Sequence, residues 1–286
     1  MANKQKQMNF ILRQIKQTFN DSESAFVFRA LTGKSYGEFY LDDKQAEFDW
    51  DRFSKICELR AKQPDMPIQY LFNKVYFLNF ELYIDQRVMI PRFETEELVM
   101  KSYQRLCSIK SPDRVKFIID IGTGSGVIAI ALAFLFPKAF LLATDISDSA
   151  LAVAKFNIEK LCLENRIRLV CSDLFTNITN DSLADLIISN PPYIPSEEID
   201  MLPLNVLKYE PRLAIDGGKD GFELIAKIIA QAPAYLQPDG FLALEIDPHQ
   251  ARLISEINQN NTVKFAADFE PDNNNFTRYA FIKYYN

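Results

Sequence analysis

The tetrapeptide Asn190-Pro191-Pro192-Tyr193 carries the most specific chemistry in this sequence. Two successive prolines fix the backbone angle φ and remove two N–H donors, which holds the carbonyl group of Pro191 in one direction. With the side-chain oxygen of Asn190 it forms a pair of acceptors aimed at one point. A planar NH₂ group placed there would donate both hydrogens, and Tyr193 would offer a flat ring for stacking. A plain Asn-Pro turn does not account for all four residues, which suit methyl transfer to an amide or aromatic amine.

A glycine-rich turn lies earlier in the chain. Residues 116–120 have the short, β-branched or aromatic composition of a buried strand, and Gly122, Gly124 and Gly126 separate it from a predicted helix. Glycine permits positive φ angles and lets a ligand lie against the main chain, while the helix start offers unpaired N–H groups. Val127 stands where the dinucleotide fingerprint G-x-G-x-x-G needs its third glycine. The acidic-x-G-x-G-x-G spacing is instead similar to the methyl-donor loop of class I S-adenosylmethionine-dependent methyltransferases.

Polar residues end four successive predicted strands. Strands and helices alternate along this half of the chain, which predicts a mostly parallel sheet covered on both faces. Ligands of such sheets bind beyond the carboxyl ends of the strands. One aspartate at a strand end is usually a turn or cap residue, but a series of four favours a ligand site. The four residues are Asp120, Asp145, Asp173 and Asn190.

Each of these positions suits part of a nucleoside methyl donor. Asp145 lies 19 residues past Gly126, where a carboxylate accepts hydrogen bonds from ribose hydroxyls. Asp173 would accept from an exocyclic amine, and Leu174 would supply an apolar wall. The predicted donor site comprises Gly122, Thr123, Gly124, Ser125, Gly126, Asp145, Asp173, Leu174 and Asn190, and the predicted catalytic residues are Asn190, Pro191, Pro192 and Tyr193.

Composition limits the class of protein. The 286 residues are 48% hydrophobic, enough to bury a substantial core, and contain no apolar run long enough to span a membrane. Four cysteines without a C-x-x-C pair fit a reducing compartment, so we expect a cytoplasmic protein. His249 is the only histidine, which excludes a multi-histidine metal site and leaves little room for Ser-His catalysis. We therefore expect no metal.

The charge distribution argues against nucleic acid as a partner. Residues 1–85 hold 12 basic and 12 acidic side chains, so the rest of the chain carries the whole net charge of −6. Residues 190–223 contain seven acidic and three basic side chains. Nucleic-acid affinity comes largely from neutralising phosphates, which this acidic region would repel.

The expected organisation has three parts. Residues 1–73 show helical stripes over 9–19, 22–31 and 45–62 and form a predicted helical docking domain. Residues 74–88 alternate like a β-hairpin that turns near Leu78-Asn79 and links the domains. Residues 89–286 form the α/β domain, a class I (Rossmann-like) methyltransferase sheet.

Taken together, these motifs resemble the PrmC/HemK family of peptide-chain release factor glutamine methyltransferases over essentially the whole chain. Two further segments, Pro91–Glu96 and Tyr209–Ala214 with Gly217-Gly218, narrow the resemblance, although the family commonly has proline at the position of Phe93. The resemblance implies methylation of the glutamine amide nitrogen in the Gly-Gly-Gln loop of class I release factors, with S-adenosylmethionine as donor. It also implies that the N-terminal helices help to dock the protein substrate, and we expect a monomer.

Three alternatives remain open at this stage. A glutamine methyltransferase that acts on a large-subunit ribosomal protein would share the chemistry and layout. An amino-directed DNA methyltransferase would share Asn-Pro-Pro-Tyr, but the acidic region and the absence of length for a target-recognition domain argue against it. A non-catalytic adenosine-binding module would not need the intact acceptor motif.

Overall fold

The computed structural model describes residues 2–41, 47–179, 181–260 and 264–285. The chain divides into two compact units, Met1–Lys74 and Val75–Asn286. Within the described residues, no helix is both long and apolar enough to cross a membrane.

The first unit is helical. Its elements are α1 (Ala2–Ile15), α2 (Asp21–Thr32), α3 (Tyr36–Leu41), α4 (Trp50–Lys62) and α5 (Ile68–Phe72). Asn20 caps α2 through a reciprocal capping box with Glu23, which explains why this helix starts where it does. The predicted third helix was to begin near residue 45; residues 42–46 lie outside the described part, and the observed α4 begins at Trp50.

The second unit opens with the predicted hairpin. Strands β1 (Val75–Phe77) and β2 (Phe80–Leu82) pair antiparallel, and Leu78 turns between them with φ of 50°. The buried Asn157 fixes the chain after the hairpin, because its side chain accepts from the N–H of Tyr83 at 2.7 Å and donates to the Tyr83 carbonyl at 2.9 Å. The same amide donates to the carbonyl of Ser125 at 2.9 Å. The hairpin is thereby tied to the glycine-rich turn.

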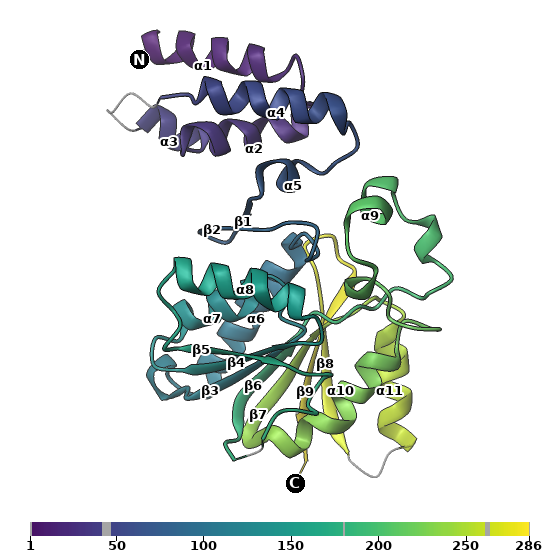
Figure 1. The fold of residues 1–286 in the computed structure, drawn as a ribbon. Helices are drawn as coiled ribbons and strands as arrows, with labels where there is room; N and C mark the ends of the chain where they lie inside the picture. Colours follow the sequence, from purple (N-terminus) through teal and green to yellow (C-terminus); the bar gives the residue numbers. More distant parts are fainter. Residues whose placement is uncertain (1, 42–46, 180, 261–263, 286) are drawn as a thin grey trace. The chain divides into compact units, whose positions relative to one another are not determined.

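A seven-stranded sheet forms the centre of the second unit (Figure 1). Its strand order is β5-β4-β3-β6-β7-β9-β8. The first five strands in this order run parallel to one another, and β9 is antiparallel to both β7 and β8. The strands are β3 (Phe117–Ile121), β4 (Phe140–Asp145), β5 (Ile167–Cys171), β6 (Ala184–Ser189), β7 (Leu236–Glu245), β8 (Phe265–Pro271) and β9 (Thr277–Tyr284). The mostly parallel sheet predicted from the sequence is confirmed.

Helices cover both faces of the sheet (Figure 1). One face carries α6 (Phe93–Ile109), α7 (Val127–Leu135) and α8 (Asp148–Lys160), and the other carries α10 (Glu223–Gln231) and α11 (Gln250–Asn260). Strands of a sheet covered on both sides are buried along their whole length, as in β6, whose six residues are all buried and four of them apolar. The α10 side of the core includes Ile187, Leu244, Ile225 and Ile254.

The chain between β6 and α10 follows a longer and less regular path than the sequence predicted. It contains the short helix α9 (Leu204–Tyr209), which the periodicity did not indicate. The predicted helix 219–236 is shorter in the structure, because α10 ends at Gln231 and a 3₁₀ turn, Ala232–Tyr235, follows. Pro233 explains the change, since a proline in a helix interior lacks the N–H that the α-helical pattern needs.

Candidate active site

The glycine-rich turn between β3 and α7 presents main chain to a cavity. Gly122, Gly124 and Gly126 have φ angles of 73°, 55° and 84°, in the left-handed region that favours glycine. The N–H of Thr123 donates to the carbonyl of Thr144 at 2.8 Å, which joins the turn to β4. Gly126 has a second constraint, since a Cβ there would lie 3.3 Å from the Cβ of Ala154.

Asp145, the last residue of β4, supports this turn from the side. One carboxylate oxygen accepts from the N–H of Gly124 at 2.9 Å, and the other accepts from the N–H of Ser147 at 2.9 Å. Burial raises the pKa of Asp145, and the backbone hydrogen bonds partly offset that rise. A carboxylate has about four lone-pair sites, so Asp145 can still accept from a further donor.

The ends of β5 and β6 complete the same edge. Asp173 is exposed, and Leu174 turns the chain after β5 with φ of 49°. Asn190 follows β6 and is half-buried. Its Nδ2 donates to the hydroxyl of Thr95 at 2.9 Å, and Ser189 donates to the carbonyl of Ile121 at 2.7 Å.

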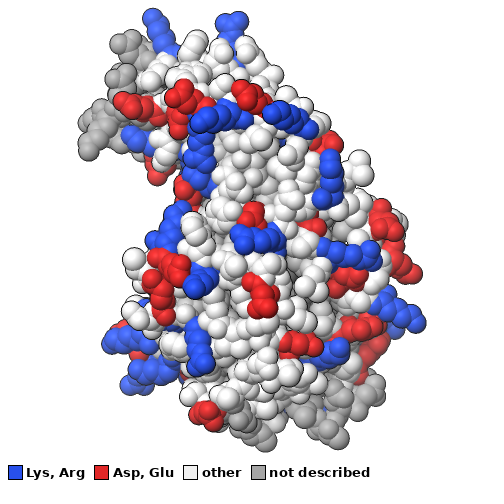
Figure 2. Space-filling view, in the orientation of Figure 1, with Lys and Arg blue, Asp and Glu red and all other residues white. Residues whose placement is uncertain are grey.

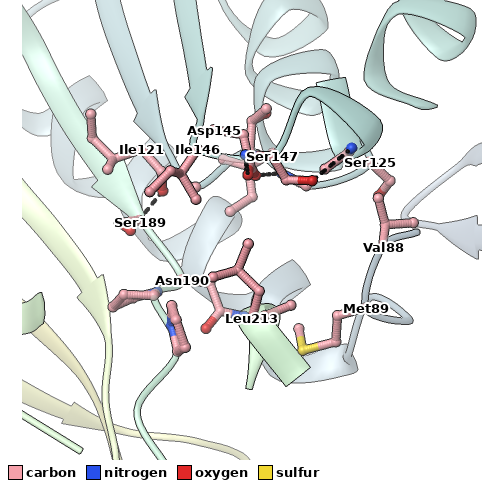
Figure 3. Close-up of a pocket in the computed structure, with 18 of the residues that line it drawn as sticks. Val88, Met89, Ile121, Ser125, Asp145, Ile146, Ser147, Ser189, Asn190 and Leu213 are labelled. Atoms are coloured by element: carbon pink, nitrogen blue, oxygen red, sulfur yellow. Dashed lines mark hydrogen bonds between the residues drawn. The ribbon is translucent and has the colours of Figure 1, made fainter. Parts of the chain in front are cut away.

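One cavity brings most of the predicted residues together (Figure 3). It contains about 1170 Å³ of space between protein atoms, including space open to solvent. Figure 3 shows Asp145, Ser125, Met89, Leu213 and Asn190 around it. The predicted residues that line it are Gly122, Thr123, Gly124, Ser125, Asp145, Asp173, Leu174, Asn190, Pro191 and Pro192.

Two of the predicted site residues are not among those that line the cavity. Gly126 is buried at the start of α7. Tyr193 packs against the apolar core on the α10 side of the sheet, and its hydroxyl donates to Glu245 at 3.4 Å. In this position Tyr193 is placed to hold a buried carboxylate, whereas the sequence suggested a ring that stacks on a ligand.

Sequence reasoning from single motifs missed much of the cavity wall. The residues it did not name include Val88, Met89, Pro91, Thr95, Ile146, Leu213 and Ala214. Most of them lie in or beside the two segments that narrowed the family resemblance, Pro91–Glu96 and Tyr209–Ala214. The structure links these segments directly, because Arg92 donates to the buried carboxylate of Glu210 at 2.5 Å. The resemblance was therefore the signal that could have found them.

Two carboxyl groups are buried beneath the site. Burial raises the pKa of Asp120 to about 7, although the hydroxyl of Thr123 donates to its carboxylate at 2.6 Å. Burial also raises the pKa of Glu245, at the end of β7, to about 7. Perturbed carboxyls next to a concave site are typical of functional sites.

Asn190-Pro191-Pro192-Tyr193 is held from behind by a second layer of backbone. The buried side chain of Gln250 donates to the carbonyls of Tyr193, at 3.2 Å, and Gly221, at 2.7 Å. Gly217 and Gly221 approach so closely that a Cβ would lie 2.8 Å from the Pro192 carbonyl oxygen and 2.2 Å from that of Tyr193, respectively. Only glycine fits at these two positions without moving the tetrapeptide.

The strand order, the glycine-rich turn and the polar strand ends around one cavity define a class I methyltransferase. The methyltransferase small domain family matches residues 104–207. The catalytic domain of hMettl16, solved in complex with a 3′UTR hairpin, has the same fold, with a TM-score of 0.58 at 18% identity. That similarity covers 91% of this chain and 93% of the solved chain.

Sequence relatives identify the particular family. The release factor glutamine methyltransferase of Rhodopirellula baltica is 37% identical over 203 residues, which cover 71% of this chain and 69% of the relative. The enzyme of the same name from Gloeobacter violaceus is 35% identical over 237 residues, which cover 82% of this chain and 81% of the relative. The ribosomal protein uL3 glutamine methyltransferase of Francisella tularensis is 40% identical over 188 residues, which cover 66% of this chain and 59% of the relative. The chain belongs to the PrmC/HemK family of glutamine methyltransferases, as its motifs predicted, and it is an enzyme.

The close approach of Gly221 to Tyr193 predicts a large effect of a single methyl group. Gly221→Ala should lower the free energy of unfolding of the second unit by roughly 2–4 kcal/mol, because overpacking against rigid backbone adds to the strain of a positive φ. Gly122→Ala is the matched control. Gly122 has a similar φ of 73°, compared with 70° at Gly221, but nothing lies within 4 Å of its Cβ position. It should lose only about 1–2 kcal/mol. Equal losses in urea unfolding would contradict this account.

Proposed function

We propose that this enzyme transfers a methyl group from S-adenosylmethionine to the side-chain amide nitrogen of the glutamine in the Gly-Gly-Gln motif of class I release factors. One observation carries the proposal: Asn190, with two prolines behind it, and the glycine-rich turn with Asp145 line the same cavity. A donor on one wall and an amide on the other would thus meet inside one cavity. The choice of a release factor as substrate is supported by relatives that are named release factor glutamine methyltransferase.

The residues of the cavity fit S-adenosylmethionine, which supplies a methyl group on a positively charged sulfur. Asp145 has lone pairs free to accept from ribose hydroxyls, and the exposed carboxylate of Asp173 would accept from the adenine amine. Leu174, Ile146 and Leu213 provide apolar surface for the ring. The turn Gly122–Ser125 would lie against the amino acid part of the donor through its main chain.

On the opposite wall, Asn190 and Pro191 would hold the acceptor amide. The side-chain oxygen of Asn190 and the carbonyl of Pro191 would accept its two N–H groups, which turns the nitrogen toward the donor. Such a contribution is orientation and electrostatic placement. Pro192 is the second of the two prolines that fix the backbone here. The hydroxyl of Tyr193 anchors the tetrapeptide to Glu245.

The charge of the second unit supports a protein substrate over nucleic acid. On the face shown in Figure 2, Lys and Arg side chains are interspersed with Asp and Glu, and no continuous basic stripe forms among the described residues in view. Three expectations from the sequence stay predictions: that the protein does not bind nucleic acid directly, that it is a monomer and that it is cytoplasmic.

A ribosomal protein is the second candidate substrate, because the uL3 enzyme of Francisella tularensis is a relative at 40% identity. Incubation of the enzyme with labelled donor and either purified class I release factor or purified uL3, side by side, separates the two. We expect the release factor to be methylated at least tenfold faster, with mass spectrometry locating one methyl group on the Gly-Gly-Gln glutamine. Faster labelling of uL3 would reassign the substrate, and labelling of any residue other than glutamine would refute amide methylation.

Asp145→Ala and Asn190→Ala should impair different steps, donor binding and turnover respectively. Asp145→Ala should weaken donor binding by on the order of 2–4 kcal/mol, because hydrogen bonds to a charged acceptor are lost. Asn190→Ala should lower turnover by roughly 10²-fold, the effect of losing one preorganised polar group, with donor affinity nearly intact. Calorimetry and single-turnover kinetics measure both quantities. Unchanged donor affinity would remove Asp145 from the site, and near-normal turnover would remove Asn190.

We also propose that the helical first unit, residues 1–73 of the predicted organisation, docks the protein substrate. A chain shortened to Val75–Asn286 should bind the donor like the full chain, since these residues form a compact unit. It should methylate a short Gly-Gly-Gln peptide as well as the full chain does and lose most of its activity on intact release factor. Thermal unfolding and donor binding confirm that the shortened chain is folded. Full activity of this folded chain on the intact protein would assign the helices a structural role only.

A further inference from the structure

The side chain of Asn190 belongs to a chain of hydrogen bonds that leads into the core. Its Nδ2 donates to Oγ1 of Thr95 at 2.9 Å, and the Thr95 hydroxyl donates to Oε2 of Glu245 at 2.9 Å. The hydroxyl of Tyr193 reaches the other carboxylate oxygen of Glu245 at 3.4 Å. Thr95 comes from the first turn of α6, Asn190 from the end of β6 and Glu245 from the end of β7, so three separate elements meet here.

The number of available hydrogens decides which group donates and which accepts in each of these hydrogen bonds. An ionised Glu245 only accepts, and a threonine hydroxyl has one hydrogen, so that hydrogen must point to Glu245. The oxygen of Thr95 then has only lone pairs left for Asn190, and it accepts from the NH₂ end of the amide. Asn190 therefore keeps its oxygen, its only acceptor, for the cavity that it lines. Thr95 and Glu245 are 3% and 1% exposed, so the bond between them is shielded from bulk solvent.

We propose that Thr95 and Glu245 are positioning residues that fix the side-chain amide of Asn190 with its oxygen toward the acceptor amide. This inference rests on the proposed function, because it assumes that Asn190 accepts a hydrogen bond from the glutamine NH₂ group. Neither residue touches the substrate amide in this account. Their effect is to exclude the flipped amide, which would present an NH₂ group to another NH₂ group.

The surroundings of Glu245 make this orientation dependent on pH. Arg278 on β9 favours the ionised form, and Glu94 at the start of α6 opposes it. Tyr193 reaches the carboxylate with its hydroxyl. Tyr279, paired with Glu245 across β7 and β9, instead shares its one hydroxyl hydrogen between the Glu97 carboxylate and the Glu94 carbonyl, each at 3.0 Å. Burial has the largest effect and raises the pKa of Glu245 to about 7.

Protonation of Glu245 allows the hydrogen bonds between Asn190, Thr95 and Glu245 to run in the reverse donor-to-acceptor direction. A protonated carboxyl can donate to Thr95, which is then free to donate to the oxygen of Asn190. The amide would flip and turn its NH₂ end to the cavity. Because the pKa is raised, this protonated form persists up to about pH 7. Turnover should therefore be highest above pH 7 and fall as the pH drops through that value.

Substitution of Thr95 tests the positioning directly. Thr95→Val keeps the shape but removes the hydroxyl, and it should lower kcat about tenfold or more at saturating donor, with donor affinity unchanged. Thr95→Ser should restore most of the rate. Ser102→Ala is the matched control, because Ser102 is a fully buried residue of the same helix whose hydroxyl has no partner among the described residues. A Thr95→Val enzyme as fast as the Ser102→Ala enzyme would overturn the proposal.

The pH profile of kcat tests the role of Glu245. Glu245→Gln does not titrate in this range, so the fall in kcat below pH 7 should disappear, whatever the absolute rate of the variant. Asp120 also has a pKa of about 7, but it lies beneath the donor turn, and saturating donor removes its effect on binding. A Glu245→Gln enzyme that keeps the wild-type fall in kcat below pH 7 would contradict the proposal.

A measurement without substrate separates this inference from the proposed function. The Nδ2 hydrogen that Asn190 donates to Thr95, followed by ¹⁵N NMR in the full-length enzyme, should exchange slowly at pH 8 and at least tenfold faster in Thr95→Val. Fast exchange in the wild-type enzyme would overturn the positioning role, whatever the substrate. Slow exchange in an enzyme that fails to methylate glutamine would uphold the orientation of Asn190 and refute only the proposed function.

Discussion

Parallel strands deliver the residues that follow them to one edge of a sheet, and four adjacent strands do so here. Ile121 lies opposite Thr144 in β4 and opposite Ser189 in β6, and Asp145 lies opposite Cys171 in β5. The register therefore brings the turn at Gly122, the Asp145 carboxylate and Asn190 to the same height. A shift of one residue in any pair would also send every side chain of a strand to the other face of the sheet. The cavity depends on this register more than on any single contact.

Buried charge is the cost of this arrangement. Asp120 and Glu245 have pKa values of about 7, which means that the folded chain binds their protons more tightly than the unfolded chain does. Both carboxyls consequently contribute less to stability at neutral pH than in acid. A core selected for stability alone would place apolar side chains at both positions, since such replacements are often neutral or stabilising. Asp120 bonds Thr123 of the glycine-rich turn and Glu245 bonds Tyr193, so both carboxyls support segments that line the cavity.

Local sequence predicted the fold, and most of the site residues it named line one cavity in the structure. Strand composition, glycine spacing and polar strand ends identified the sheet, the turn at Gly122–Gly126 and the residues that follow four strands, because these features depend on neighbours in the chain. The hydrogen bonds that join Thr95 to Asn190 and to Glu245 span 95 and 150 residues, and no local pattern encodes such pairs. Tyr193 illustrates the same limit. Its ring chemistry suggested stacking on a ligand, whereas in the structure its hydroxyl donates to Glu245, 52 residues away in the sequence.

Methylation of an amide poses a problem of orientation more than of proton removal. The nitrogen lone pair of an amide is delocalised toward its carbonyl, so a base such as histidine would not by itself make that nitrogen face the donor. His249, the only histidine, pairs with Asp247 beyond the end of β7 and is not among the residues that line the cavity. Fixed acceptors address the problem directly, because they bind both N–H groups and leave the nitrogen only one direction. An acceptor that can itself flip, as asparagine can, achieves this only when a partner behind it excludes the wrong orientation. If Asn190 holds the acceptor amide as proposed, Thr95 and Glu245 are in the place where such a partner is needed.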